Sequence, residues 1–112
     1  MISVDEKNNI IDVSVVGQLE YEKAEELLGI VKNKVINMSS ERVNLDFSRI
    51  NYVNSIGIGT VVTIYKLLRE RGKQLIILRP QPNVMRVLKL TKISEVIEIE
   101  GEPRWKEIIL SF

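Results

Sequence analysis

Hydrophobic and polar residues alternate along the first part of the chain, as they do in half-buried strands. Residues 2–7 and 10–17 form two β-prone runs. In the second run one face carries Ile11, Val13 and Val15, and the other carries Asp12, Ser14 and Val16. Only Asn8 and Asn9 separate the runs, and asparagine tolerates the positive φ of a two-residue hairpin turn. The pattern therefore predicts an antiparallel hairpin.

Helical spacing replaces this alternation in four later segments. Residues 20–37 carry apolar side chains at Ala24, Leu27, Leu28, Val31 and Val35. Residues 56–71 carry Val61, Ile64, Tyr65 and Leu68 after first turns that are apolar nearly all round, so we expect this helix to start buried and end exposed. Residues 83–90 carry Val84, Val87 and Leu88. Trp105, Ile108, Ile109 and Phe112 predict a last helix that packs on the core.

Three further strands are predicted between these helices. They cover residues 43–47, the continuously apolar residues 74–78 and residues 96–99. Residues 48–55 are interpreted as a polar connection, which places Ser55 at the N-cap of the following helix. The predicted order is β-β-α-β-α-β-α-β-α. It indicates one α/β domain over residues 1–112, with a mixed four- to five-stranded sheet and about four helices.

The amino-acid composition excludes several classes of function. The chain has 112 residues, a net charge of +1, no cysteine and no histidine. Near-neutral charge argues against nucleic acid as a partner. The missing residue types remove thiolate and imidazole chemistry, so we expect no enzyme activity, no metal and no cofactor. No apolar run is long enough to span a membrane and no signal peptide is evident, so we expect a cytoplasmic protein.

Residues 45–59 are the most distinctive stretch, reading Leu-Asp-Phe-Ser-Arg-Ile-Asn-Tyr-Val-Asn-Ser-Ile-Gly-Ile-Gly. A hydrolase nucleophile elbow would need another glycine and a histidine, and a dinucleotide-binding loop would need a third glycine. In one account, Ser55 only caps the helix and the glycines only allow tight packing. In the other, the sheet or a partner approaches the glycines, and the Ser55 hydroxyl at a helix N-terminus is a place for a phosphate. Gly57→Leu separates these accounts, since only packing against the domain itself would make it unfold.

This stretch resembles the signature of the STAS domain found in bacterial anti-sigma factor antagonists. The likeness continues through residues 65–75 and 82–91, and the order of elements agrees. The resemblance implies a partner switch. An unphosphorylated antagonist binds an anti-sigma factor that is also an ATP-dependent serine kinase, and phosphorylation of the matching serine, Ser55, ends that binding. The family usually has Asp before this serine, whereas this chain has Asn54.

The predicted partner surface extends beyond this stretch. Residues 18–21 and 79–82 follow strands and should lie at the same end of the sheet as Ser55, where ligand sites of α/β proteins gather. The predicted partner-binding residues are Asn54, Ser55, Ile56, Gly57, Tyr52, Glu20 and Arg79. We expect a monomer or weak dimer.

Two other functions stay open from the sequence. One is a STAS subunit that acts as a scaffold in a stress-sensing or transport complex, where Ser55 need not be modified. The other is a small enzyme or nucleotide-binding protein that uses the loop at residues 55–59.

Overall fold

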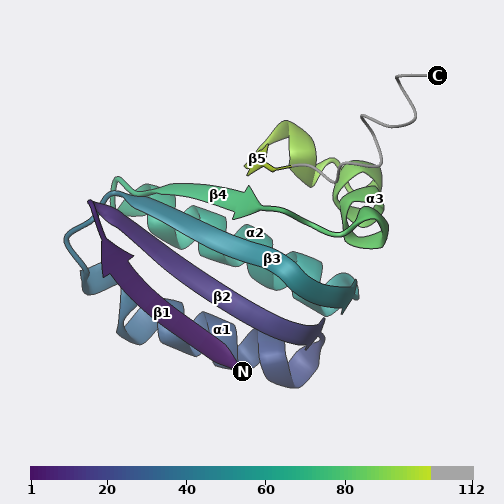
Figure 1. The fold of residues 1–112 in the computed structure, drawn as a ribbon, viewed down its shortest axis with the longest axis horizontal. Helices are drawn as coiled ribbons and strands as arrows, with labels where there is room; N and C mark the ends of the chain where they lie inside the picture. The colour runs from purple at the N-terminus through teal and green to yellow at the C-terminus, as the bar shows by residue number, and fades with distance from the viewer. Residues whose placement is uncertain (102–112) are drawn as a thin grey trace.

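A five-stranded mixed sheet forms the centre of the computed structural model, which describes residues 1–101 (Figure 1). The strands are β1 (Ile2–Lys7), β2 (Ile10–Leu19), β3 (Arg42–Val53), β4 (Gln74–Leu78) and β5 (Glu98–Glu100), and they lie in that order across the sheet. β1 is antiparallel to β2, and all the other pairs are parallel. The helices are α1 (Tyr21–Asn33), α2 (Ser55–Glu70) and α3 (Pro82–Leu90). The α/β class, the mixed sheet and the order of elements are confirmed over these residues.

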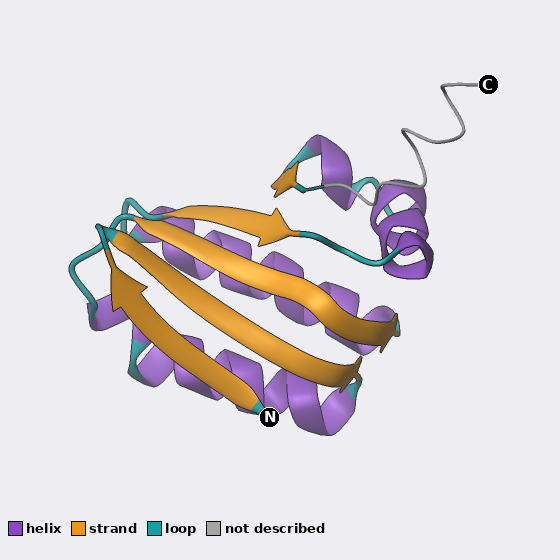
Figure 2. Ribbon diagram, viewed as in Figure 1, coloured by secondary structure: helices purple, strands orange, loops and turns teal. Residues whose placement is uncertain are grey.

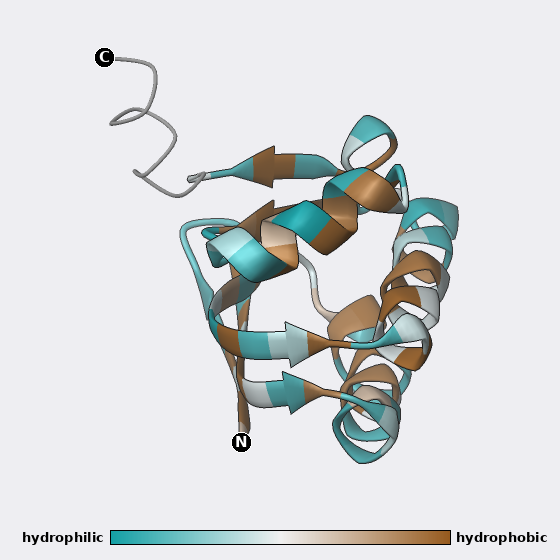
Figure 3. Ribbon diagram, turned by 90° about the vertical axis from the view of Figure 1, so that its right-hand side faces the viewer, coloured by the Kyte–Doolittle hydropathy of each residue, from teal (hydrophilic) through white to brown (hydrophobic). Residues whose placement is uncertain are grey.

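α1 and α2 cover one face of the sheet, and α3 lies beyond the carboxyl end of β4 (Figures 1 and 2). Figure 3 shows α1 and α2 stacked on one side of the strands. The core lies in this layer and is built from alternate strand residues and the inner helix stripes. It includes Ile11, Val13, Val15, Ala24, Leu27, Val31, Val43, Leu45, Phe47, Val61, Ile64 and Leu68. Full burial of each large aliphatic side chain contributes about 1.5–3 kcal/mol, so this layer is a main source of the stability of the fold.

The hairpin forms as predicted, and the first helix is shorter than predicted. Asn8 and Asn9 have φ of 54° and 63°, the left-handed values that a two-residue turn requires. α1 ends at Asn33, and residues Val35–Asn37 form a separate 3-10 turn. The predicted helix over residues 20–37 is interrupted at Lys34, whose φ of −128° is not helical. The tighter turn still buries Val35.

β3 is the largest departure from the expected elements, since the predicted polar connection at residues 48–55 is mostly strand. β3 continues to Val53 and stays paired with β2 as far as Leu19. The register shifts twice, so the buried residues after Phe47 are Ile50 and Val53, three positions apart. An alternation with period two cannot detect a strand whose inward side chains recur every third residue.

Two smaller differences lie in α2 and near β5. The start of α2 is not buried, because Ser55, Ile56 and Gly59 are exposed. β5 begins at Glu98 rather than at residue 96, after a 3-10 turn over Ile93–Glu95. The predicted last helix, with Trp105, Ile108, Ile109 and Phe112, lies outside the described residues.

Candidate functional site

Ser55 is the first residue of α2, and its neighbour caps the helix. The Asn54 side-chain oxygen Oδ1 accepts a hydrogen bond of 3.0 Å from the Gly57 N–H. The prediction that Ser55 is the N-cap was therefore wrong by one position. Asn54 has the extended backbone of an N-cap residue, and its carboxamide reaches the N–H of the third residue of the helix. The exposed Ser55 hydroxyl is left without a capping role.

The end of β2 holds this turn in place. The Asn54 N–H donates to the Leu19 carbonyl oxygen at 3.4 Å. Gly57 is buried, and a Cβ at its position would lie 2.3 Å from the same oxygen. Gly57, which we predicted to contact a partner, therefore faces β2 on the side where a side chain would stand. Gly59 differs, because a Cβ there would meet nothing within 4 Å, so no close approach within the described residues explains it.

Large apolar side chains are exposed on the elements that lead into and out of the Ser55 turn. Tyr52 is the next-to-last residue of β3, and Ile56 follows Ser55 in the first turn of α2. The neighbouring end of β2 and start of α1 add two more. The exposed fractions are 45% for Tyr52, 47% for Ile56, 58% for Tyr21 and 37% for Val16. Exposed large apolar side chains are a feature of protein-binding surfaces. We call these four residues the apolar rim.

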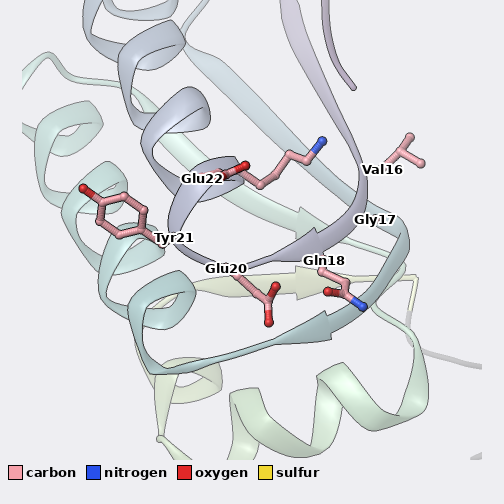
Figure 4. Close-up of a pocket in the computed structure, with 7 residues that line it drawn as sticks. Val16, Gly17, Gln18, Glu20, Tyr21 and Glu22 are labelled. Atoms are coloured by element: carbon pink, nitrogen blue, oxygen red, sulfur yellow. The ribbon is translucent and has the colours of Figure 1, made fainter.

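A shallow hollow of about 510 Å³ adjoins the rim (Figure 4). It is lined by Val16, Gly17, Gln18, Glu20, Tyr21, Glu22 and Lys23. In Figure 4 the Tyr21 side chain extends away from Gln18. Glu20 stands directly after Leu19, the residue that receives the Asn54 hydrogen bond, so its carboxylate belongs to the same end of the sheet as Ser55. Glu20, Tyr52, Asn54, Ser55 and Ile56 are thus brought to one end of the fold.

Arg79 is not brought to this end. β4 stops at Leu78, which pairs with Asp46, and the Arg79 guanidinium donates to the Asp46 carboxylate at 2.7 Å. Val53 follows Asp46 by seven residues in β3, a separation on the order of 20 Å along a strand. Burial raises the pKa of Asp46, but hydrogen bonds from Ser48 and Arg79 outweigh it and leave this pKa below its usual value. The expectation that the turns after β2 and β4 end side by side failed because β4 is much shorter than β3.

The segment after Arg79 does reach toward the site. The Gln81 side-chain amide donates to the Ser48 carbonyl oxygen at 2.9 Å, and the Asn83 amide donates to the Asn51 carbonyl oxygen at 2.7 Å. These bonds satisfy carbonyl groups along the bulged part of β3. They also tie the start of α3 to the segment that leads into Ser55.

The predicted partner-binding residues did not include Val16, and they included Tyr21 only as part of the segment at residues 18–21. Val16 gave a usable signal, because it is an apolar residue on the otherwise polar face of β2. As a single residue, Tyr21 fits the helical stripe of the buried Ala24 and the partly buried Leu28, which predicts a core position. It is exposed because α1 begins beyond the end of the core.

Residues 1–101 offer neither a candidate metal site nor a membrane-spanning helix. No group of three or more His, Cys, Asp or Glu side chains in this part could hold a metal ion. None of its helices is both long and apolar enough to cross a membrane.

Comparison with known proteins gives one consistent result. A family model described as "STAS domain" matches residues 1–104. The anti-sigma-B factor antagonist of Listeria monocytogenes is 29% identical over 100 residues, which cover 82% of each chain. An anti-sigma factor antagonist from Mycobacterium paratuberculosis has a similar fold, with a TM-score of 0.79, 18% identity, and coverage of 99% of this chain and 92% of that one. The unphosphorylated anti-sigma factor antagonist SpoIIAA has a TM-score of 0.70 at 14% identity, covering 99% and 97%.

Proposed function

Because this chain belongs to the STAS domain family, we propose that it is an anti-sigma factor antagonist whose binding surface surrounds Ser55. Its partner in this proposal is an anti-sigma factor that is also an ATP-dependent serine kinase. Phosphorylation of Ser55 by that kinase ends the binding and so regulates sigma-factor-dependent transcription. The names of the curated relatives support the antagonist role.

The observation that carries the proposal is the exposed Ser55 beside an apolar rim. Ser55 is exposed at the start of α2, and its hydroxyl is not used by the helix cap. Tyr52 and Ile56 stand within three residues of it on the chain, and both expose nearly half of their surface. Exposed aromatic and aliphatic side chains are the usual anchors of protein interfaces. A kinase can therefore reach the hydroxyl on the same surface that binds the partner.

The chemistry of the turn explains why phosphate would act as a switch. A phosphoserine carries about −1.5 to −2 charges at neutral pH. The free N–H groups and the dipole of α2 favour this charge on the domain itself, so the fold tolerates the modification. A partner that covers the rim would have to bury the same charge against apolar side chains, which is costly. Glu20, at the same end of the sheet, adds a like charge.

Binding to the anti-sigma factor kinase of the same organism tests the proposal. Titration calorimetry would compare the wild type with Ser55→Ala and Ser55→Glu. We expect Ser55→Ala to bind the kinase in the presence of ATP without losing affinity over time, and Ser55→Glu to bind at least tenfold more weakly. Thr63→Glu is the matched control, because Thr63 is exposed on the same helix, on the order of 12 Å from Ser55.

Two results would refute parts of this proposal. Equal affinity of Ser55→Glu and Thr63→Glu would show that charge at Ser55 does not control binding. No binding by any variant would remove the antagonist role and leave the scaffolding function as the better account.

A further inference from the structure

The second half of β3 has a strand on one side only. β4 pairs with β3 as far as Leu78, which stands opposite Asp46, and β3 then continues to Val53. Over these last residues, β2 is the only strand that pairs with β3 in the described part of the chain. The backbone groups that β3 turns toward the β4 side therefore need partners other than a strand.

α3 supplies such partners through two side-chain amides. It lies beyond the end of β4, next to the later part of β3 (Figure 1). The Gln81 amide donates to the Ser48 carbonyl oxygen at 2.9 Å, and the Asn83 amide donates to the Asn51 carbonyl oxygen at 2.7 Å. Both distances are ordinary for N–H···O hydrogen bonds. We call the Gln81 and Asn83 side chains the α3 tether.

The two carbonyl groups that the α3 tether binds belong to residues at the register shifts of β3. The first shift comes after Asp46, where Phe47 and Ser48 stand opposite a single residue of β2. The second comes before Tyr52, where Asn51 is an extra residue without a partner in β2. An extra residue at a bulge loses its pairing across the ladder. The α3 tether therefore holds the backbone at both places where the pairing with β2 is interrupted.

The register shifts decide which way the last residues of β3 face. Tyr52 is 45% exposed, whereas the next residue, Val53, is 6% exposed. Adjacent strand residues point to opposite faces of a sheet, so a change of register by one residue would exchange their surroundings. Val53 leads directly into Asn54 and Ser55, so the same register also sets where α2 begins.

The α3 tether starts from a part of the molecule that is packed on the core. Gln81 is the N-cap residue of α3, but its side chain makes no cap hydrogen bond and is free to bind β3. Pro82, between the two tether residues, fixes the backbone angle φ at the start of the helix. Three side chains of α3 are buried, namely Val84, Met85 and Leu88. Both amides are thus presented from a rigid element, as positioning groups need to be.

We propose that Gln81 and Asn83 are positioning residues for the partner-binding surface. They hold the register shifts of β3 and thereby set how Tyr52 and Ser55 are presented to the anti-sigma factor. This inference rests on the proposed function, because its consequence is a change in partner binding.

Removal of both amide donors tests the proposal in titration calorimetry with the kinase. Gln81→Met combined with Asn83→Leu keeps side chains of similar size, and leucine is a better helix former than asparagine. We expect this double variant to bind about tenfold more weakly, since two hydrogen bonds that hold the surface are lost. Its far-ultraviolet circular dichroism should match the wild type. Gln74→Leu removes an exposed amide at the opposite end of β4 and should keep the wild-type affinity.

Amide hydrogen exchange tests the same residues without a partner. The Asn54 N–H bonds to the Leu19 carbonyl oxygen, and the Gly57 N–H bonds to the Asn54 side chain, so both report on the Ser55 turn. We expect both to exchange at least about fivefold faster in the double variant, because the turn opens more often. The N–H of Leu27, in the buried stripe of α1, should keep its rate.

A conservative variant separates the amide donor from mere packing. Asn83→Gln keeps a donor and should behave as the wild type in both measurements, whereas Asn83→Leu alone should bind more weakly and exchange faster.

Three results would overturn the proposal. One is wild-type exchange of Asn54 and Gly57 in the double variant, and another is an equal effect of Asn83→Leu and Asn83→Gln. The third is faster exchange together with wild-type affinity for the kinase. Failure of the proposed function looks different, because Ser55→Glu then binds as tightly as Thr63→Glu or the wild type does not bind at all. In that case the exchange rates alone decide whether the α3 tether holds the turn.

Discussion

Gly57→Ala is expected to destabilise the domain, although alanine is the better helix former. The Cβ of alanine would lie 2.3 Å from the Leu19 carbonyl oxygen and 2.9 Å from a methyl carbon of Val53. The oxygen belongs to the backbone of β2 and accepts the hydrogen bond from Asn54, so it cannot move aside as a side chain can. The backbone of α2 or of β2 must therefore shift.

The expected magnitude follows from two opposing effects. Gly→Ala within a helix ordinarily adds about 1 kcal/mol of stability. Forcing an extra carbon into a packed site costs about 1–3 kcal/mol, and a clash with backbone belongs near the upper value. The net loss in the free energy of unfolding is therefore about 2 kcal/mol. Gly59→Ala should gain about 1 kcal/mol, because the new Cβ meets nothing within 4 Å.

Urea denaturation followed by far-ultraviolet circular dichroism measures both changes on the same scale. The two variants make the same substitution two residues apart, and we expect their free energies of unfolding to differ by about 3 kcal/mol. Equal midpoints, or a Gly57→Ala variant more stable than the wild type, would refute the packing argument. By the same geometry, Gly57→Leu should unfold the domain, as the account of glycine as a packing residue requires.

Three further changes test other parts of the structure. Asn54→Asp should keep the helix cap, since a carboxylate also accepts the N–H bond, and should raise the rate of radiolabelled phosphate incorporation into Ser55 by the kinase severalfold; equal rates would show that the missing charge is unimportant. Lys73→Met should lower the free energy of unfolding in urea by about 2–4 kcal/mol, because it leaves unpaired two backbone carbonyls that the buried ammonium now binds, and a loss below about 1 kcal/mol would contradict this. Hydrogen bonds from the Ser40 hydroxyl and N–H hold the pKa of Glu6 below its usual value, so the stability due to ionised Glu6 is present above the ordinary carboxyl pKa and is lost as the pH falls through the lowered one. Glu6→Gln should therefore flatten the decline of stability in acid, and an unchanged slope in denaturation at several pH values would disprove the linkage.

Regular periodicity explains how much of the fold the sequence predicted. The hairpin, the inner stripes of α1 and α2 and the order of elements all depend on local spacing, which needs no knowledge of neighbours. The length of β3 was underestimated, because its second half forms by pairing with β2 across two register shifts. Such pairing depends on both strands and cannot be seen in the sequence of one. The position of Arg79 depends on how much shorter β4 is than β3, and the sequence of either strand alone does not show this difference.

The candidate site shows the same limit on a smaller scale. Sequence spacing found the turn, the serine and the helix start, but a cap at Ser55 and a cap at Asn54 fit the sequence equally well. The extended backbone of Asn54 decides between them. The two glycines also look alike in sequence, and only the position of the Leu19 carbonyl separates a packing residue from an exposed one.

Asn54 caps α2 and Ser55 does not, and this affects how the surface can evolve. Asn54 supplies the hydrogen bond that starts α2, and the adjacent hydroxyl supplies none. Substitutions at Ser55 can therefore be selected for their effect on signalling alone, because they do not remove the hydrogen bond that caps α2. If Ser55 is the switch proposed above, a lineage could lose the serine and keep an intact, permanently active domain, or regain it by a single codon change. Regulation at this position is in that sense separable from folding, and related chains can differ in one without differing in the other.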